Sequence, residues 1–458
     1  MVYSIIQKSQ LEGAHRIDAE YYQPEFLNVK DTLLSKEYFV LGKHAFITDG
    51  EHGSVEFTDH GIRYLTAENI QEGFINSSDA RFVSELVDKR NRRASLLPDD
   101  VVISIKGTVG QAAIAFDENI PSNMNRDVSR IHVKDSINPY YLVAFLNSKF
   151  GRGQTLRESS GNVQQMTTLG RIRELLIPII SDSDASEIEL IIRKARNELK
   201  NSETSYQQAE DLLLEELGLS TFAQDLDDNK ELSWIVNLSD VKSANRVDAE
   251  YFQPKYEKIL KKLKGKQTDV LKNHFQILRG KNFAYYHEGE AGVIKTKQLR
   301  KQFIDFQVED RTKNETIQKE NLPTIKDSDV VFASMGVGSL GKTNIFYAFE
   351  TNGTFTIDST IRIFRSKNLD ILPEVLAVYL SSSIGQELIY KYIVGSSGII
   401  SIYENYLSNF PIPVLPKETQ QKIAELVRMS HGARKKSKEL LEEAKRKVEE
   451  MIENEGKN

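Results

Sequence analysis

The chain has 458 residues, of which 40 % are hydrophobic, so it is long enough for two or three domains with buried cores, and a disordered or fibrous protein is disfavoured. Sixty lysines and arginines face 66 aspartates and glutamates, a net charge of −6, so any binding of a polyanion has to be local. The absence of cysteine excludes disulfides, thiolate zinc sites and cysteine nucleophiles.

The first residues, MVYSIIQKSQLEG, lack the basic flank and long apolar run of a signal peptide. No later window reaches the length of about 18 apolar residues that a membrane-spanning helix requires. The sequence therefore predicts a cytoplasmic protein.

A long internal repeat organises the chain. Arg16–Phe26 reads RIDAEYYQPEF and Arg246–Tyr256 reads RVDAEYFQPKY, with seven of eleven positions identical at an offset of 230. Further segments correspond in the same order, at offsets that drift to about 237 and back: Ser4–Ile6 with Trp234–Val236, Asp100–Val102 with Asp329–Val331, Tyr141–Leu146 with Val375–Leu380, Ser159–Gly161 with Ser396–Gly398, and Ile177–Ile179 with Ile412–Val414. Each half is expected to have the same architecture.

Within each repeat the pattern predicts mixed α and β structure. Short runs with strand chemistry, separated by Gly and Asn clusters, cover residues 101–105, 112–116 and 128–133 in the first repeat and 330–333, 343–347 and 360–364 in the second. Short helices are predicted at 140–147 and 373–381, with Pro139 and Pro373 near their first turns.

Each repeat ends in a long predicted helix. Apolar or small residues alternate at steps of four and three, the spacing of a coiled-coil seam. They are Ile188, Ile192, Ala195, Leu199, Ser202, Tyr206, Ala209 and Leu213 in the first helix, and Ile423, Val427, Ser430, Ser437, Leu441, Ala444, Val448 and Met451 in the second, where Arg434 interrupts the spacing. The first helix, from about Ala185 to Leu217, would be roughly 50 Å long and end at Gly218.

The two seams have the same pattern, so we expect the helices to pack on each other, antiparallel, with one globular repeat at each end. The alternative is that each helix only covers its own domain. The acidic stretch Asp225–Asp228 is expected to link the first helix to the second repeat.

The segment Gly336–Thr343 matches the phosphate-binding loop GxxxxGK[ST] letter for letter. Such a loop needs a strand before it and a helix after it, because the helix N-terminus binds the phosphates. The residues after Lys342 alternate and are aromatic, which favours a returning strand. The first repeat has Lys106–Gln111 at the equivalent place and lacks Gly-Lys-Thr. A nucleotide site is therefore disfavoured.

Other motif-like segments are weaker. Asn138–Tyr141 resembles the NPPY signature of adenine methyltransferases without its second proline, and the other repeat keeps only a proline at a helix start. Pro98–Asp100 with Lys106 resembles a PD…(D/E)xK nuclease site, but Ser104 stands where an acidic metal ligand is required. A polar turn leading into a strand explains it better. The eight histidines have no metal-ligand spacing.

Local charge is the signal that remains. Between Lys255 and Lys342 there are 18 basic and 11 acidic residues, a local charge of +7. The first repeat has a smaller basic run at Arg81, Lys89, Arg90, Arg92 and Arg93. Most charge runs are solvated surfaces, so this alone favours nucleic acid only weakly.

The order repeat, helix, repeat, helix resembles the specificity subunit of Type I restriction-modification enzymes over essentially the whole chain. The residues that carry this resemblance are the two DAEY motifs, the turns at Asp49-Gly50 and Arg279-Gly280 before Gly61–Tyr64 and Gly292–Lys295, the strand-glycine units Asp100–Gly110 and Asp329–Gly338, and the proline-rich segment Phe410–Pro416 with Thr419-Gln420-Gln421 after it.

The resemblance implies a mixed α+β fold, with two pseudo-repeated globular target-recognition domains separated by two long antiparallel coiled-coil helices. The expected boundaries are 1–182 for the first target-recognition domain, 183–219 for the central helix, 220–415 for the second domain and 416–458 for the C-terminal helix.

The function that the resemblance implies is recognition of a bipartite, asymmetric target in double-stranded DNA, without catalysis by this chain. Each domain would read a half-site from the major groove, and half-sites on one face of DNA recur at about 34 Å. The implied partners are two methyltransferase subunits and endonuclease/translocase subunits. S-adenosylmethionine, ATP and Mg²⁺ would bind to those partners and not to this chain.

The candidate DNA contacts are polar residues in and near the glycine turns. They are Arg63, Lys106, Thr108 and Arg126 in the first repeat and Lys281, Lys295, Lys297, Ser334 and Lys342 in the second. Lys106 and Lys342 lie beside glycines, where backbone can approach a groove closely. The alternatives are a P-loop nucleotidase that uses Lys342 and Thr343, and a repeat scaffold that binds protein partners.

Overall fold

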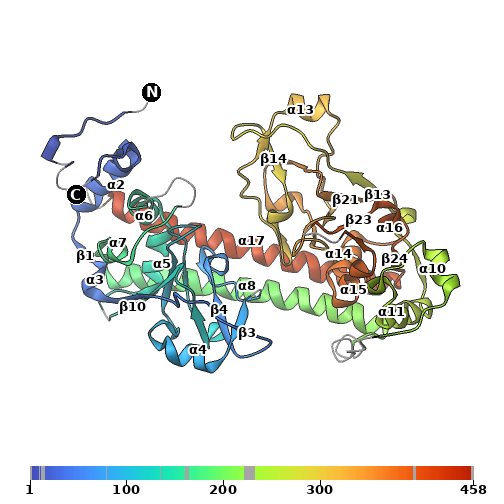
Figure 1. Ribbon diagram of the computed structural model, residues 1–458. Helices are drawn as coiled ribbons and strands as arrows, with labels where there is room; N and C mark the ends of the chain where they lie inside the picture. The colour runs from blue at the N-terminus through green and yellow to red at the C-terminus, as the bar shows by residue number, and fades with distance from the viewer. Residues whose placement is uncertain are drawn as a thin grey trace. The chain divides into compact units, whose positions relative to one another are not determined.

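The computed structural model describes residues 3–9, 11, 16–78, 80–134, 136–159, 165–220, 233–395 and 399–454. The chain divides into two compact units (Figure 1). Unit 1 comprises Met1–Leu199 and Lys436–Asn458, and unit 2 comprises Lys200–Lys435. Each unit thus contains one globular repeat and parts of both long helices. The predicted acidic linker at 225–228 lies outside the described residues.

Unit 1 contains a five-stranded sheet of order β2-β10-β7-β8-β5, a four-stranded sheet of order β3-β6-β4-β9 and the pair β1-β11. Its elements before the long helix are η1 (Ala19–Tyr22), α2 (Pro24–Leu34), β1 (Tyr38–Val40), α3 (Leu41–His44), β2 (Ala45–Asp49), β3 (Phe57–Thr58), β4 (Ile62–Leu65), η2 (Ala67–Asn69), β5 (Gly73–Phe74), β6 (Arg81–Val83), α4 (Glu85–Arg90), η3 (Arg92–Ala94), β7 (Val101–Ser104), β8 (Ala112–Ile114), η4 (Asp117–Asn119), β9 (Ser122–Met124), β10 (Val128–Val133), α5 (Pro139–Asn147), α6 (Lys149–Arg157), α7 (Leu169–Arg173) and β11 (Leu176–Pro178).

Unit 2 contains sheets of order β13-β21-β18-β19 and β17-β14-β20 and the pairs β12-β24, β15-β16 and β22-β23. Its elements are α10 (Leu238–Ala244), η5 (Ala249–Phe252), α11 (Pro254–Lys264), β12 (Thr268–Val270), α12 (Leu271–His274), β13 (Phe275–Arg279), β14 (Ala291–Ile294), η6 (Thr296–Gln298), β15 (Leu299–Arg300), β16 (Phe303–Ile304), β17 (Arg311–Thr312), α13 (Asn314–Lys319), β18 (Val330–Ala333), β19 (Thr343–Ile345), η7 (Ala348–Glu350), β20 (Thr354–Ile357), β21 (Ile361–Ser366), α14 (Pro373–Ser381), α15 (Ser383–Lys391), β22 (Ile393–Val394), β23 (Ser401–Ile402), α16 (Glu404–Ser408) and β24 (Pro411–Pro413).

The central sheets of the two units have the same strand order. The sequence β2-β10-β7-β8 in unit 1 corresponds to β13-β21-β18-β19 in unit 2, and all neighbouring strands in both are antiparallel. The registers agree as well, because Val101 pairs with Ile131 and the corresponding Val330 pairs with Phe364. The prediction of one repeated architecture is therefore confirmed, and each of the six predicted strands overlaps a strand of the structure.

The two long helices, α8 (Asp182–Leu217) and α17 (Lys417–Asn454), lie side by side (Figure 1). In unit 1, Ser437 of α17 donates a hydrogen bond to the carbonyl of Ala195, 2.7 Å away, and in unit 2 Ser202 and Ser430 lie 3.0 Å apart. Because the start of each helix packs on the end of the other, the pair is antiparallel as predicted. Among the described residues, no helix has both the length and the apolar character needed to span a membrane.

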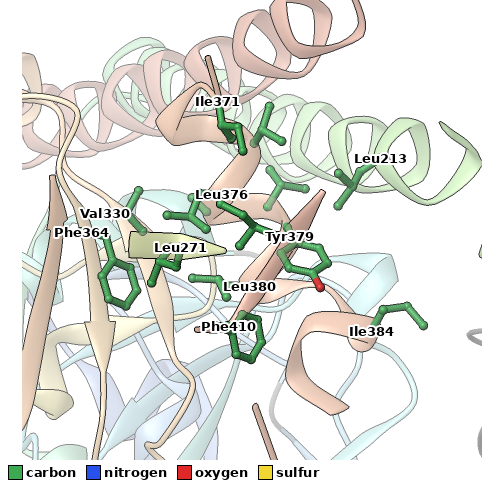
Figure 2. Packing of buried hydrophobic residues seen from close by; sticks show 14 of the residues in the cluster. Leu213, Leu271, Val330, Phe364, Ile371, Leu376, Tyr379, Leu380, Ile384 and Phe410 are labelled. Carbon is green, nitrogen blue, oxygen red and sulfur yellow. The ribbon is translucent and has the colours of Figure 1, made fainter. Parts of the chain in front are cut away.

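The seam residues enter the cores of the units. In unit 1, Ile188, Ile192 and Ala195 pack with Ala444 and Val448. In unit 2, the core combines Leu213 of α8 with the nearly all-buried helix α14, and Figure 2 shows Leu213, Leu376 and Tyr379 among the buried side chains of this cluster. The long helices are thus part of both hydrophobic cores. Gly218, with φ of +66°, ends α8 in the left-handed conformation expected of a C-terminal glycine.

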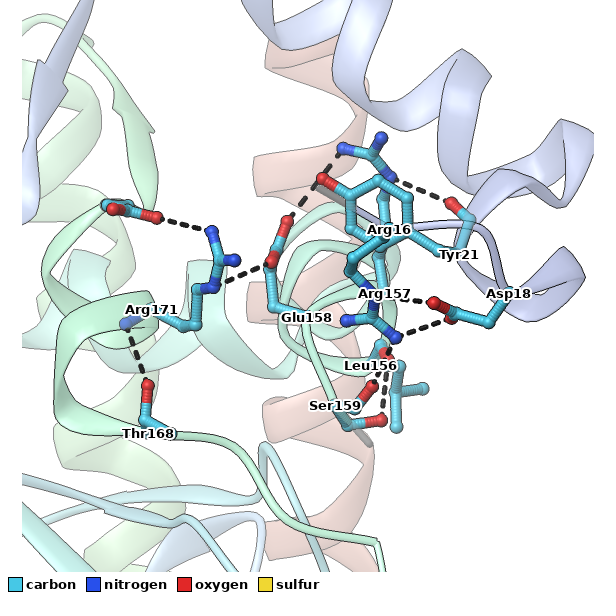
Figure 3. A network of polar contacts seen from close by, with 10 residues as sticks. Arg16, Asp18, Tyr21, Leu156, Arg157, Glu158, Ser159, Thr168 and Arg171 are labelled. Atoms are coloured by element: carbon cyan, nitrogen blue, oxygen red, sulfur yellow. Dashed lines mark hydrogen bonds and ion pairs between the residues drawn. The ribbon is translucent and has the colours of Figure 1, made fainter. Parts of the chain in front are cut away.

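The repeated DAEY motif forms the same polar network in each unit. The guanidinium of Arg16 donates to Asp18 at 2.8 and 2.5 Å and to the carbonyl of Ser159 (Figure 3), and Arg246 bonds in the same way to Asp248 and to the carbonyl of Ile393. The hydrogen bond from each arginine lowers the pKa of its aspartate. The motif therefore ties each repeat's N-terminal segment to the end of its α6 or α15.

A cation also covers the motif tyrosine in both units. Arg157 donates to the carbonyl of Tyr21 at 3.0 Å and lies 3.9 Å from the centre of its ring. Lys391 does the same with Tyr251, at 2.7 Å and 3.7 Å. The cation–π contact adds to the hydrogen bond, so the same anchor is built with two different cations.

The long helices begin differently. Gln420 in α17 is fully buried: its amide accepts from the backbone N–H of Leu372, before α14, and donates to the carbonyls of Asp370 and Leu415. In α8 the corresponding residue is Ala185, and a cavity of about 640 Å³ lies there. It is lined by residues that include Phe39, Asp99, His132, Asn138, Tyr141 and Ala185.

Candidate nucleic-acid interface

In unit 1, the turns at one end of the central sheet bring together part of the predicted site. Lys106 follows β7 and its Nζ lies 3.8 Å from Oδ1 of Asp127, just before β10. Arg126 is exposed on the same turn, and its backbone N–H donates to the carbonyl of Glu51 at 3.0 Å. Thr108 is exposed in the turn between β7 and β8. Arg63 lies on the separate β3-β6-β4-β9 sheet and is half-buried.

Two further arginines join this end of unit 1. Arg90 lies 3.2 Å from Glu51 and Arg93 lies 3.6 Å from Asp49, with 61 % and 55 % of their side chains exposed. The Gly53 backbone N–H and the Arg90 side chain both lower the pKa of Glu51. The sequence showed these arginines as a basic run and did not place them in the site, because their acidic neighbours are about 40 residues away.

The backbone also approaches closely here. A side chain on Gly50 would place its Cβ 1.9 Å from the carbonyl oxygen of Met124, and one on Gly280 in unit 2 would lie 1.8 Å from the carbonyl of Asp358. Only glycine fits at these two turns, which directly follow β2 and β13. The prediction that these glycines mark corresponding turns agrees with the structure.

In unit 2, three predicted lysines lie in the loops around β14. Lys295 Nζ is 2.8 Å from Asp310 and 3.8 Å from the centre of the Tyr285 ring. Lys297 Nζ is 3.1 Å from Glu309, and Lys281 donates to the carbonyl of Glu320. The hydrogen bond from Lys295 lowers the pKa of Asp310. Surface ion pairs of this kind are worth at most about 1 kcal/mol, so a phosphate can replace the carboxylate at little cost.

Ser334 is not available as a contact. It is 1 % exposed, and its hydroxyl donates to the carbonyl of Thr360 at 2.9 Å. The Ser334 carbonyl accepts from the backbone N–H of Ile402. The prediction that Ser334 faces DNA is therefore corrected: this serine fixes the start of the β18–β19 turn. Lys342, at the end of that turn, is exposed.

The segment Gly336–Thr343, which matches the phosphate-binding motif, forms the turn between β18 and β19. Gly336, Gly338 and Gly341 have positive φ, and Thr343 begins strand β19 instead of a helix. Its hydroxyl donates to the carbonyl of Gly341 at 2.8 Å. Without a helix N-terminus after the loop, the backbone cannot hold a phosphate in the way this motif requires. The predicted returning strand is confirmed.

The other motif-like segments have structural roles. Asn138 caps α5 by accepting from the backbone N–H groups of Tyr140 and Tyr141. Asp100 is fully buried and bonded to Arg130 at 2.6 Å and to His132 at 2.8 Å. The described residues contain no group of three or more His, Asp or Glu side chains arranged to hold a metal ion.

The two units differ in charge at corresponding loop positions. The isolated bridges Glu51–Asn125 and Lys281–Asp358 occupy the same place in the two units, so Lys281 stands where unit 1 has Glu51. The bridges Lys106–Met166 and Met335–Ser401 likewise place Met335 where unit 1 has Lys106. At these positions a cation in one unit is replaced by an anion or an apolar side chain in the other.

The structural register also corrects one detail of the sequence comparison. The carbonyl of Leu65 accepts from Asn125 N–H and that of Ile294 accepts from Asp358 N–H, so Leu65 corresponds to Ile294. This differs by two residues from the pairing of Gly61–Tyr64 with Gly292–Lys295. Counting from this point, Lys295 and Lys297 correspond to Thr66 and Glu68.

Residues 255–432 match the family model described as the Type I restriction modification DNA specificity domain. This segment of the chain is therefore similar to that DNA specificity domain. The matched segment covers most of the second repeat, and unit 1 repeats its sheet order and its DAEY motif.

The comparison with solved structures also gave matches to restriction-modification proteins. The S subunit of a Type I restriction-modification system from M. genitalium is 12 % identical, covers 91 % of this chain and 94 % of its own, and gives a TM-score of 0.39. The HsdS subunit from Thermoanaerobacter tengcongensis is 14 % identical over 91 % and 96 %, with a TM-score of 0.30. The type IIG restriction endonuclease BpuSI is 11 % identical over 41 % and 30 %, with a TM-score of 0.32. A comparison with curated proteins gave no match.

Proposed function

We propose that this chain is the non-catalytic DNA specificity subunit of a Type I restriction-modification system. In this role it recognises a bipartite, asymmetric sequence in double-stranded DNA, with one half read by unit 1 and the other by unit 2. Two methyltransferase subunits and the endonuclease/translocase subunits would be positioned on DNA through it. S-adenosylmethionine, ATP and Mg²⁺ would bind to those partners.

One observation carries the asymmetry. The two units share a scaffold, yet Lys281 stands opposite Glu51, and Met335 opposite Lys106. Each base pair shows its own pattern of donors and acceptors in the major groove. Two identical scaffolds with different side chains at the same loop positions would therefore select different half-sites.

The candidate contacts divide by chemistry. Lysines hold phosphates as point charges, whereas arginines can also bind guanine edges through two hydrogen bonds. In unit 1 the exposed arginines Arg90, Arg93 and Arg126 supply base-reading groups, with Lys106 nearby. In unit 2 the loops offer Lys281, Lys295, Lys297 and Lys342, which favour phosphate contacts.

The test uses the chain in complex with its methyltransferase. We expect Lys295→Gln with Lys297→Gln to weaken DNA binding and to lower the slope of log affinity against log salt by about 2, because two phosphate contacts are lost. Methylation mapping should still show the half-site read by unit 1. Lys436→Gln, an exposed change on α17, serves as the control. An unchanged salt slope in the double variant would contradict these contacts.

The arginines of unit 1 provide the complementary test. Arg90→Ala, Arg93→Ala and Arg126→Ala should each relax the sequence at one half of the methylated motif and leave the other half intact. A titration with ATP and Mg²⁺ separates the nucleotidase alternative, since binding that Lys342→Ala abolishes would favour it.

A further inference from the structure

The DAEY motif and the two residues before it, Arg16–Tyr21 in unit 1 and Arg246–Tyr251 in unit 2, contain two sets of side chains. The first set faces inward and explains why folding requires it: Arg16 with Asp18, and Tyr21 under Arg157, have direct counterparts in unit 2. The second set faces outward. Ile17 is 90 % exposed and Val247, its counterpart, is 89 % exposed. Folding of either unit does not require these branched apolar side chains.

Two more outward positions are identical in both copies. Ala19 and Glu20 are exposed in unit 1, and Ala249 and Glu250 are exposed in unit 2. Among the described residues, neither Glu20 nor Glu250 takes part in a hydrogen bond or an ion pair. We call Ile17, Ala19 and Glu20, and their counterparts Val247, Ala249 and Glu250, the motif face.

A single exposed isoleucine needs no explanation, because isolated apolar side chains are common on protein surfaces. The motif face is different, because the same apolar and acidic residues are exposed at the same offset in two repeats whose loop residues differ. Val247 lies in the middle of the chain, so its exposure is not an effect of a terminus. Ile5 and Ile235, 89 % and 100 % exposed, form a second pair at the same offset.

The charge of the motif face selects the kind of occupant. Asp18 and Asp248 are each neutralised by an arginine, so Glu20 and Glu250 supply the uncompensated negative charge of the motif face. Such a surface repels phosphate, which argues against DNA. An apolar side chain beside a carboxylate fits a protein surface with an apolar pocket next to a lysine or arginine. Because the surface exists twice, its partner binds twice.

We propose that the motif face of each unit docks one copy of the methyltransferase subunit, through an apolar pocket that receives Ile17 or Val247 and a cation that pairs with Glu20 or Glu250. This inference rests on the proposed function, which requires two methyltransferase subunits. It assigns them to two equivalent surfaces outside the DNA-reading loops.

The experiment is the stoichiometry of the complex. The chain is coexpressed with the methyltransferase encoded beside it, and native mass spectrometry counts the bound copies. We expect two copies on the unchanged chain, one on Ile17→Asp or Val247→Asp, and none on the double variant, with at least about a tenfold loss of affinity at each altered surface. Glu20→Lys and Glu250→Lys should weaken the same two surfaces to a smaller extent.

Two exposed leucines outside the motif provide matched controls. Leu86→Asp in unit 1 and Leu369→Asp in unit 2 alter side chains that are 76 % and 69 % exposed, and both variants should bind two copies. Circular dichroism checks folding, and Ile17→Ala with Val247→Ala gives milder variants if an aspartate disturbs it.

The outcomes separate the two proposals. Two copies bound at unchanged affinity in the single aspartate variants would overturn the motif face as the docking surface. Loss of both copies from one single variant would overturn the assignment of one copy to each unit. If the unchanged chain binds no methyltransferase, the proposed function itself fails.

Discussion

The N-terminal ends of α8 and α17 make different contacts with the buried helices on which they pack. Each follows a short strand and packs on the first turn of a buried helix, α5 or α14. In unit 2 that first turn is held by Gln420, which reaches Leu372 from α17. In unit 1 the first turn is capped by Asn138, the residue before α5, and Ala185 is one of the residues that line the cavity of about 640 Å³. Unit 1 thus has a local helix cap, and unit 2 has a contact from the long helix to the residue before α14.

The corresponding helices α5 and α14 are therefore held at their N-terminal ends by different interactions. The Asn138 side chain accepts from the N–H groups of Tyr140 and Tyr141 in the first turn of α5, whereas Gln420 accepts from the N–H of Leu372, the residue before α14. Leu372 has no side-chain acceptor, so α14 depends on α17. Four substitutions test how far the two units differ in the contacts that stabilise corresponding elements.

The largest effect is expected from Arg428→Ala. Arg428 is bonded to Glu374, which is fully buried, whereas the corresponding Arg193 pairs with the partly exposed Glu189. Removing Arg428 leaves a buried carboxylate without its cation, and we expect unit 2 to lose about 3 kcal/mol of unfolding free energy. Arg193→Ala should cost unit 1 about 1 kcal/mol or less. Urea denaturation measures both, and equal losses would contradict the comparison.

Gln420→Ala is expected to cost about 2 kcal/mol. The change leaves the N–H of Leu372 and the carbonyls of Asp370 and Leu415 without their partner, and opens a void in unit 2. Gln207→Ala, which removes an exposed glutamine from α8, is the control and should change stability by less than about 0.5 kcal/mol. Hydrogen exchange should show faster opening of the first turn of α14 in Gln420→Ala alone.

Lys391 makes one anchor of unit 2 dependent on pH. Burial, together with the neighbouring charge of Arg246, lowers the pKa of Lys391 from 10.5 to about 8. Between about pH 8 and 10.5 the folded chain has lost this proton while the unfolded chain retains it, so the free energy of unfolding should rise with pH. Lys391→Arg introduces the cation that unit 1 has at 157 and should remove this rise. Parallel curves for the two proteins from pH 8 to 10 would refute it.

The smallest effect is expected from Ala185→Gln, which introduces into unit 1 the side chain that unit 2 has. The new amide would lie near the backbone around Ser136, Asn138 and Ile180, which corresponds to the partners of Gln420. We expect a gain of up to about 1 kcal/mol, because the ordering of a long side chain offsets part of the new bonds. A loss of stability, measured by urea denaturation, would show that the cavity does not match the amide.

The features predicted well from the sequence are those that local patterns encode. The seam from Ile188 to Leu213, the strand cores and the helix starts at Pro139 and Pro373 depend on periodicity and on residues close in sequence. The repeat was recognised from the similar segments Arg16–Phe26 and Arg246–Tyr256, whose inward side chains form the same polar network in each unit. These parts of the fold follow from spacing alone.

The parts that were missed depend on distant residues. The pairs β1-β11 and β12-β24 join segments more than 130 residues apart, and each strand has only three residues. Ser334 was predicted to contact DNA because it precedes a glycine turn. In the structure it is buried, and its hydroxyl donates to the carbonyl of Thr360. Arg90 and Arg93 gained a place in the candidate site only through Asp49 and Glu51. No local pattern contains these contacts.

The serines in the helix seam have a consequence for assembly. Ser202 faces Ser430, and Ser437 bonds to the carbonyl of Ala195, so hydroxyl groups meet polar partners within an otherwise apolar stripe. If one helix slid along the other by a heptad, Ser202 would no longer face Ser430, and Ser437 would no longer reach the carbonyl of Ala195. Only the observed longitudinal alignment keeps both of these contacts. A pair of α-helices that could otherwise mesh in several ways is thereby restricted to a single one.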